Sequence, residues 1–231
     1  EVTLPRCTSL WGSTTLLLAV ARSAQRGQLA PILGPVFHLA MPLKGLSSMK
    51  QLILVGMPGA GKSTIARQLA RRLARDPVDS DGVIEQRLGE SIRSFFERQG
   101  EAAFRDVEEQ VIDELTQSQP AAVLATGGGA VLRSINRVRL RERGTVIYLR
   151  SSPEQLFKRL RHDTRRPLLQ GGDALQKLRD LYEERDPLYR DCAHFVVDTR
   201  GSTLSMLVNR IVMQLELMPP EPPSTPPTAA P

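Results

Sequence analysis

GMPGAGKST, from Gly56 to Thr64, follows the short apolar run Gln51–Val55. It fits the phosphate-binding pattern G-x-x-x-x-G-K-S, in which a strand runs into a loop and the loop into a helix. Glycines let such a loop curl until successive N–H groups point inward at anionic oxygens, and the helix behind adds the positive end of its dipole. Lys62 can reach the terminal phosphates, and the Ser63 hydroxyl can hold Mg²⁺. The stretch therefore predicts binding of a nucleotide through its phosphates.

Length and composition limit the class of protein. The 231 residues allow one domain with extensions, and a hydrophobic share of 41% is enough for a core. No run approaches the roughly 18 apolar residues of a membrane span. The net charge of +6 comes from basic residues scattered among acidic ones, and aromatic residues make up only 4%. Single-strand binders interleave basic and aromatic residues, so we expect neither a nucleic acid nor a membrane as partner. Cys7 and Cys192 lack metal or redox spacing, which favours a reduced cytoplasm. We expect a monomer.

Both ends of the chain are expected to lie outside the folded domain, which we place at residues 49–217. Residues 1–48 hold one acidic residue, Glu1, and no clear period. Their apolar segment Thr14–Ala21 faintly resembles a targeting peptide. Sequence upstream of a start at Met49 is the interpretation that we favour. Residues 218–231, with the run PPEPPSTPPTAAP, predict a disordered or extended tail.

Between the ends, strand and helix signals alternate along the chain. Strands are predicted at Leu52–Val55, up to Val78, at Ala121–Ala125, at Thr145–Leu149 and at Phe195–Val197. Helices are predicted at Ser63–Ala74, Val83–Leu88, Ala102–Leu115, Pro153–Arg161, Lys177–Arg185 and Leu204–Leu217. Such alternation favours an α/β fold of three layers, with helices on both faces of a parallel sheet.

Two aspartates follow the second predicted strand, in the run Pro77-Val78-Asp79-Ser80-Asp81-Gly82. Ligands of open parallel sheets bind at the carboxyl ends of the strands, where this run lies. Asp79 could position Mg²⁺, and Asp81 could accept a proton from a substrate hydroxyl. A turn or helix cap is the simpler explanation of the run taken alone. The GTPase pattern D-x-x-G also fits but has no accompanying N-K-x-D, so we treat it as accidental.

Three further stretches carry glycines or arginines. Ala125-Thr126-Gly127-Gly128-Gly129-Ala130 ends the third strand, where a backbone or a ligand can come close. The region from Arg159 to Gly172 holds several arginines around a glycine pair, which suggests a mobile lid that brings charge onto a phosphate. In the last stretch, Glu184–Tyr189, Pro187 predicts the end of a helix.

Together these stretches resemble the shikimate kinase family, a P-loop group with the nucleoside-monophosphate-kinase type of fold. The matching segments are GMPGAGKST, DSD starting 17 residues after Lys62, GEAAFRDVE, LATGGGAV, RRPLL and ERDPLYR. All six occur in order within Met49–Leu217. The resemblance implies a P-loop kinase that uses ATP and Mg²⁺ to phosphorylate the 3-hydroxyl of shikimate, a step toward chorismate and the aromatic amino acids.

The resemblance also implies roles for individual residues. Mg²⁺ would be held by Ser63 with help from Asp79, and Asp81 would bind a ring hydroxyl and act as base. The shikimate carboxylate would be held by Arg105 and Arg185, whose planar guanidinium forks suit it, with the Gly128 backbone close to the substrate. Lys62 and Arg166 would neutralise the moving phosphoryl group, and Arg159 would lie by the adenine. The ATP phosphates would be held by Gly59, Ala60, Gly61, Lys62, Ser63, Thr64 and Arg166.

Two other functions fit part of the pattern. A P-loop kinase for another hydroxylated acid, such as gluconate, predicts the same loop and lid but not the joint carboxylate grip of Arg105 and Arg185 with the TGGG turn. A P-loop protein that binds nucleic acid or switches with its nucleotide would need a basic stripe or an aromatic platform, and the sequence shows neither.

Overall fold

The structure is a computed structural model, and it describes residues 50–160 and 173–218. The strands are β1 (Gln51–Val55), β2 (Pro77–Asp79), β3 (Val123–Ala125), β4 (Gly144–Arg150) and β5 (Phe195–Asp198). The helices are α2 (Lys62–Leu73), α3 (Ser80–Leu88), α4 (Ile92–Gln117), α5 (Ser134–Arg143), α6 (Pro153–Leu160), α7 (Ala174–Cys192) and α8 (Leu204–Leu217). Residues 161–172 of the predicted lid, the whole predicted N-terminal extension and residues 219–231 of the predicted tail lie outside the described residues.

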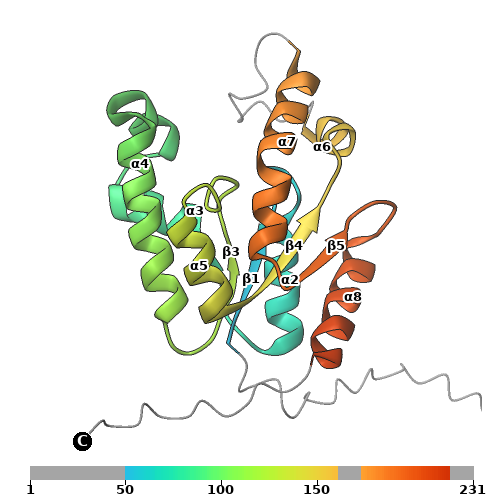
Figure 1. The fold of residues 1–231 in the computed structure, drawn as a ribbon. Helices are drawn as coiled ribbons and strands as arrows, with labels where there is room; N and C mark the ends of the chain where they lie inside the picture. Colours follow the sequence, from blue (N-terminus) through green and yellow to red (C-terminus); the bar gives the residue numbers. More distant parts are fainter. Residues whose placement is uncertain (1–49, 161–172, 219–231) are drawn as a thin grey trace, which may run out of the picture. The chain divides into compact units, whose positions relative to one another are not determined.

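The strands form a parallel sheet in the order β2-β3-β1-β4-β5. Leu54 of β1 lies opposite Ala125 of β3 and Ile147 of β4. The helices α2 and α8 pack together on one face, and α4, α5 and α7 cover the other (Figure 1). This arrangement confirms the predicted three-layer α/β fold.

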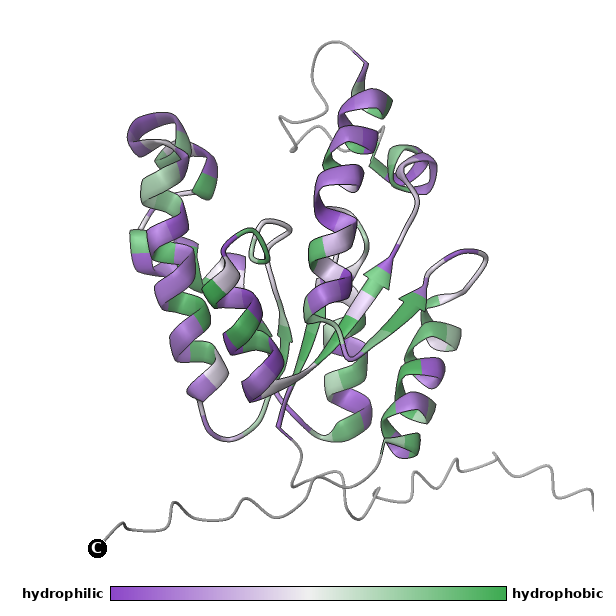
Figure 2. Cartoon of the chain, in the orientation of Figure 1, coloured by the Kyte–Doolittle hydropathy of each residue, from purple (hydrophilic) through white to green (hydrophobic). Residues whose placement is uncertain are grey.

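The sheet is the centre of the hydrophobic core. Every residue of β1 and β3 is buried, and so are most residues of β4. All three strands are largely apolar (Figure 2). A strand covered by helices on both faces has no solvent side, so it reads as a continuous apolar run rather than an alternating one. Ile65 and Leu69 of α2 and Leu140 of α5 close the core from opposite sides. No helix in the described ranges has the length and apolarity to cross a membrane.

The predicted helix end at Pro187 is wrong, because α7 continues through this residue to Cys192. A proline inside a helix removes one backbone hydrogen bond and strains the turn before it. The turn after Pro187 offsets this cost, since Tyr189 and Cys192 are fully buried in the core. The Tyr189 ring also stacks on Tyr148 of β4, with 5.0 Å between the ring centroids. Tertiary packing therefore outweighs the local propensity.

The parallel order brings the carboxyl ends of β1, β2 and β3 to one edge of the sheet. The phosphate-binding loop follows β1, the two aspartates follow β2 and the glycine turn follows β3. The helix α4, which carries Arg105, breaks at Gly100 with a φ of 79° and then runs beside α5. The candidate site residues therefore come from segments that meet at this edge, as open parallel sheets place their ligands.

Candidate active site

The phosphate-binding loop has the curled backbone that the sequence predicts. Gly59 and Gly61 have φ values of 82° and 92°, in the left-handed region that favours glycine. Gly61 is the N-cap of α2, and no side chain in the described part of the chain caps this helix end. The helices α3, α4, α7 and α8 are capped by side chains of Asp79, Ser91, Asp173 and Thr203. The N-terminus of α2, behind the curled loop, is therefore suited to bind an anionic ligand.

Lys62, the first residue of α2, folds back over this loop. Its side chain is buried, and Nζ donates to the carbonyl oxygens of Gly56 and Met57 at 2.7 and 3.0 Å. The ammonium group thus lies within the curl of the loop. Ser63 follows it and is half-buried, while Thr64 is exposed.

The two aspartates after β2 occupy different positions. Asp79 is the N-cap of α3, and its Oδ1 accepts the Asp81 N–H at 3.2 Å. Asp81 lies in the first helical turn and faces the glycine turn, where a Cβ added to Gly127 would lie 2.6 Å from its Oδ1. Between them, the buried Ser80 hydroxyl accepts the Gly127 N–H at 3.0 Å. The helix-cap explanation therefore holds for Asp79 and not for Asp81.

The three glycines after β3 are each close to a different part of the site. None has a positive φ, so space and not backbone conformation excludes a side chain. A Cβ at Gly127 would meet Asp81, and one at Gly128 would lie 2.7 Å from Cγ of Pro58 in the phosphate-binding loop. A Cβ at Gly129 would overlap the Arg105 guanidinium. The turn is therefore the place where the phosphate-binding loop, α3 and α4 meet.

Arg105 forms a buried ion pair with Glu108, one turn later in α4. Nη1 of Arg105 lies 2.7 Å from Oε2 of Glu108, whose side chain is only 2% exposed. Desolvation raises the pKa of Glu108, and the nearby Asp81 carboxylate raises it further, while Arg105 and Arg185 oppose the shift. Two carboxylates and two arginines thus face one another around the glycine turn.

Arg185 reaches the same turn from α7. Its Nη1 lies 3.5 Å from the Gly128 carbonyl oxygen, which also accepts the Tyr189 hydroxyl at 2.5 Å. Its Nε is buried and has no hydrogen-bond partner among the described residues, although an ion pair with Glu184 spans 3.7 Å. A buried donor without a partner costs free energy. The guanidinium group of Arg185 is therefore suited to bind an anion.

The structure brings together the residues predicted for phosphate and substrate contacts: Gly59, Ala60, Gly61, Lys62, Ser63, Thr64, Asp79, Asp81, Arg105, Gly128 and Arg185. Arg159 is exposed on α6, and among the described residues no hydrogen bond or ion pair joins it to this group. Leu160, the next residue, lies against Gly59, where a Cβ would be 2.7 Å from its side chain. Arg166 lies outside the described residues.

The sequence prediction did not single out Glu108 and Tyr189. Glu108 stands three residues after Arg105, and side chains at this spacing face each other on a helix. That spacing could have identified it. Tyr189 falls after the predicted helix end at Pro187, so the wrong boundary concealed it.

Known proteins are similar to this chain in sequence and in fold. A model of the shikimate kinase family matches residues 58–216. The chain is 61% identical to a shikimate kinase of Paracidovorax citrulli over 173 residues, which cover 74% of this chain and 94% of the relative. It is 55% identical to one of Burkholderia pseudomallei over 166 residues, which cover 72% and 90%.

The chain belongs to the shikimate kinase family. Among solved structures, a shikimate kinase from Acinetobacter baumannii in complex with shikimate has a TM-score of 0.71 and 43% identity, covering 75% of this chain and 96% of that one. A shikimate kinase from Aquifex aeolicus has a TM-score of 0.63 and 31% identity, covering 72% and 96%. The predicted family and P-loop kinase fold are confirmed, and ATP is the nucleotide substrate of this family.

Glu108→Gln should change how stability depends on pH. Because the folded protein raises the pKa of Glu108, it binds this proton more tightly than the unfolded chain does. The carboxyl group therefore contributes stability that falls as pH rises above its ordinary value of about 4.3. Urea unfolding of both proteins from about pH 4 to pH 7 should show that the free energy of unfolding of the wild type falls relative to that of the variant as the pH rises. A gain for the wild type over this range would mean that attraction to Arg105 outweighs desolvation.

Proposed function

We propose that the chain transfers the γ-phosphoryl group of ATP to the 3-hydroxyl of shikimate, giving shikimate 3-phosphate and ADP. The contact between Pro58 and Gly128 carries this proposal, because it brings the phosphate-binding loop against the turn that Arg105 and Arg185 flank. Phosphoryl transfer needs positioning and charge neutralisation more than covalent help. One side of this contact can hold the ATP phosphates, and the other can hold a small carboxylic acid.

The residues divide the work between the two substrates. Lys62 and the N–H groups from Gly59 to Thr64 hold the phosphates. Arg105 and Arg185 bind the shikimate carboxylate, and Glu108 keeps the Arg105 guanidinium in place through its 2.7 Å ion pair. Asp81 accepts the proton of the attacking hydroxyl as its oxygen bonds to phosphorus and ADP leaves. General-base help of this kind typically accelerates a reaction by ~10² to 10⁴.

The residues after β1 and β2 also fit Mg²⁺. Ser63 follows the lysine of the phosphate-binding loop, and Asp79 ends β2 on the same edge of the sheet. Hydroxyl and carboxylate oxygens are the ligands that Mg²⁺ prefers, usually one or two from the protein with substrate phosphates. When bound, the ion would neutralise charge on the phosphates. Ser63 and Asp79 are therefore our proposed ligands.

Other parts of the proposal rest on the sequence pattern. Arg166 would reach the ATP phosphates and Arg159 the adenine. The folded kinase domain would span residues 49–217, and the protein would act as a cytoplasmic monomer without nucleic-acid or membrane partners.

The substrate is tested by measuring ADP release. With MgATP, release should rise sharply when shikimate is added and little with gluconate or nucleoside monophosphates, because only shikimate offers both a carboxylate for the two arginines and a ring hydroxyl for Asp81. Equal stimulation by gluconate would contradict the assignment. If none of the three acceptors changes the rate of ADP release, the chain has a different activity.

A further inference from the structure

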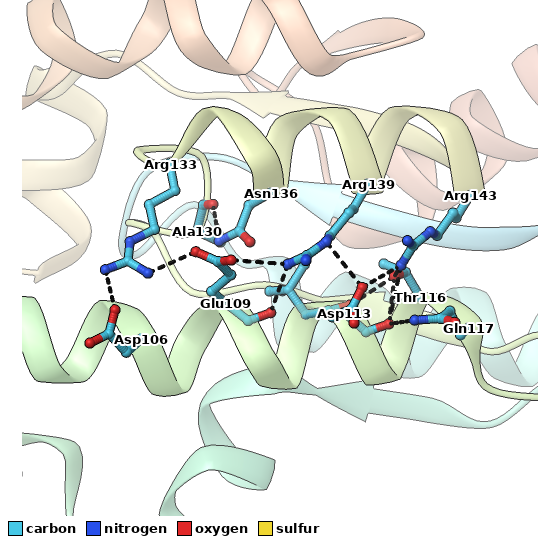
Figure 3. Close-up of polar contacts among 11 residues, drawn as sticks. Asp106, Glu109, Asp113, Thr116, Gln117, Ala130, Arg133, Asn136, Arg139 and Arg143 are labelled. Atoms are coloured by element: carbon cyan, nitrogen blue, oxygen red, sulfur yellow. Dashed lines mark hydrogen bonds and ion pairs between the residues drawn. The ribbon is translucent and has the colours of Figure 1, made fainter.

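A row of ion pairs joins α4 to α5. Arg133 donates to Asp106 and Glu109, Arg139 pairs with Glu109 and Asp113, and Arg143 pairs with Asp113. Figure 3 shows these side chains facing one another along two helices that run in the same direction. We call this row the α4–α5 ladder.

The Arg133 end of the ladder lies beside the site. Arg133 bridges two carboxylates, with Nη2 at 2.5 Å from Asp106 and Nη1 at 2.7 Å from Glu109. These two residues directly follow Arg105 and Glu108 in the chain, so they belong to the same turns of α4. Arg133 itself stands four residues after Gly129, on the segment that continues the glycine turn.

Side chains of α5 also hold the loop between Gly129 and α5. Asn136 Nδ2 donates to the Ala130 carbonyl oxygen at 3.0 Å, and Arg137 Nη1 donates to that of Val131 at 2.7 Å. The loop is therefore tied to the first turns of α5. Arg133, the N-cap residue of α5, joins this anchored loop to α4.

The ion pairs of Arg133 are too exposed to contribute much to the stability of the fold. The Arg133 and Asp106 side chains are 32% and 65% exposed, and exposed ion pairs contribute little to the stability of a fold. Geometry offers a reason for these pairs, because a planar guanidinium that bridges two carboxylates fixes both distance and orientation. Arg105 must stay over Gly129 to bind a carboxylate, and a small displacement of a binding group is costly.

We propose that Arg133 is a positioning residue that holds the turn of α4 bearing Arg105 and Glu108 against the glycine turn, and so sets the affinity for the carboxylate of the acceptor. This inference rests on the proposed function. Arg133 itself contacts Asp106 and Glu109 and acts on the substrate only through Arg105.

The test compares the two ends of the ladder. Arg143 is a matched control, since it is 34% exposed, pairs with a carboxylate of α4 at 2.7 Å and lies where α5 ends before β4. Arg133→Met should raise the KM for shikimate about fivefold, which corresponds to roughly 1 kcal/mol of lost binding. The KM for ATP and the kcat should change less than twofold. Arg143→Met should leave all three unchanged.

Two more conservative variants are controls for a general loss of structure. Arg133→Lys keeps the charge but cannot bridge both carboxylates, so it should recover part of the affinity. Asp106→Asn keeps the shape and removes the charge of one partner, so it should raise the shikimate KM about twofold. Unfolding midpoints of the Arg133→Met and Arg143→Met proteins should agree. An unchanged shikimate KM in Arg133→Met and Asp106→Asn, or an equal rise in Arg143→Met, would overturn the proposal.

A double variant tests the route through Arg105. If Arg133 acts through Arg105, Arg133→Met should raise the shikimate KM much less when Arg105 is already Lys. Full additivity would overturn the proposed route. The unsubstituted chain separates this inference from the proposed function: without shikimate-dependent ADP release, the proposed function itself fails, whereas with it only the variants bear on Arg133.

Discussion

Asp81→Asn should lower turnover by roughly a hundredfold or more while MgATP binding stays nearly unchanged. The substitution keeps the shape of the side chain but removes its ability to accept the proton of the attacking hydroxyl. Asp81 is in the first turn of α3 and does not cap that helix, so the variant should also keep its fold. Steady-state kinetics combined with titration of ATP binding would measure both effects. Turnover like that of the wild type would mean that the base lies elsewhere.

Asp79→Asn is the matched control for that experiment. It removes a charge two residues away, and asparagine caps a helix about as well as aspartate, so the N-cap of α3 should survive. Because Asp79 is a proposed Mg²⁺ ligand, added Mg²⁺ should recover part of the lost activity in Asp79→Asn but not in Asp81→Asn. The opposite pattern would mean that the two roles are reversed.

The sequence predicted most of the sheet because β1, β3 and β4 contain apolar runs bounded by glycine, proline or a functional motif. It did not predict α5, whose ten residues SINRVRLRER bury only Asn136 and Leu140. Such a helix has no apolar stripe at the helical period, so hydrophobic periodicity cannot identify it. Its contacts with α4 include the polar pairs of the α4–α5 ladder. Their partners lie 24 to 30 residues away in the chain, beyond the reach of a local pattern.

The site was predicted as a set of motifs, and the reasons for some of its residues came only with the structure. The glycine turn was expected to admit a ligand or a backbone. Its three positions face Asp81, Pro58 and Arg105, from three separate segments. No local pattern specifies such neighbours, because they depend on the strand order β2-β3-β1. The buried partner of Arg105, Glu108, was within reach through its spacing in the helix.

Arg185→Met should weaken shikimate binding by about 2–5 kcal/mol, or roughly 30-fold to a few thousandfold, because it would leave the substrate carboxylate without one of its charged partners. Stability should not fall with it. Arg185 Nε has no hydrogen-bond partner among the described residues, and the Gly128 carbonyl oxygen keeps its bond from the Tyr189 hydroxyl when the guanidinium is gone. The attraction to Glu108 that is lost is offset by removal of the buried Nε donor that has no hydrogen-bond partner, so the free energy of unfolding should change little. Calorimetric titration with shikimate and thermal unfolding would measure the two quantities separately.

Arg185→Lys separates the charge from the fork. It keeps the positive charge but cannot offer two parallel N–H groups, so we expect it to weaken shikimate binding by ~1–3 kcal/mol, less than Arg185→Met does. Binding as tight as that of the wild type would show that charge alone suffices. A parallel loss of stability and affinity in both variants would mean that Arg185 serves the packing of α7 against the glycine turn. A loss of affinity at constant stability would mean that the poorly partnered guanidinium is kept for the substrate, at a small cost to the fold.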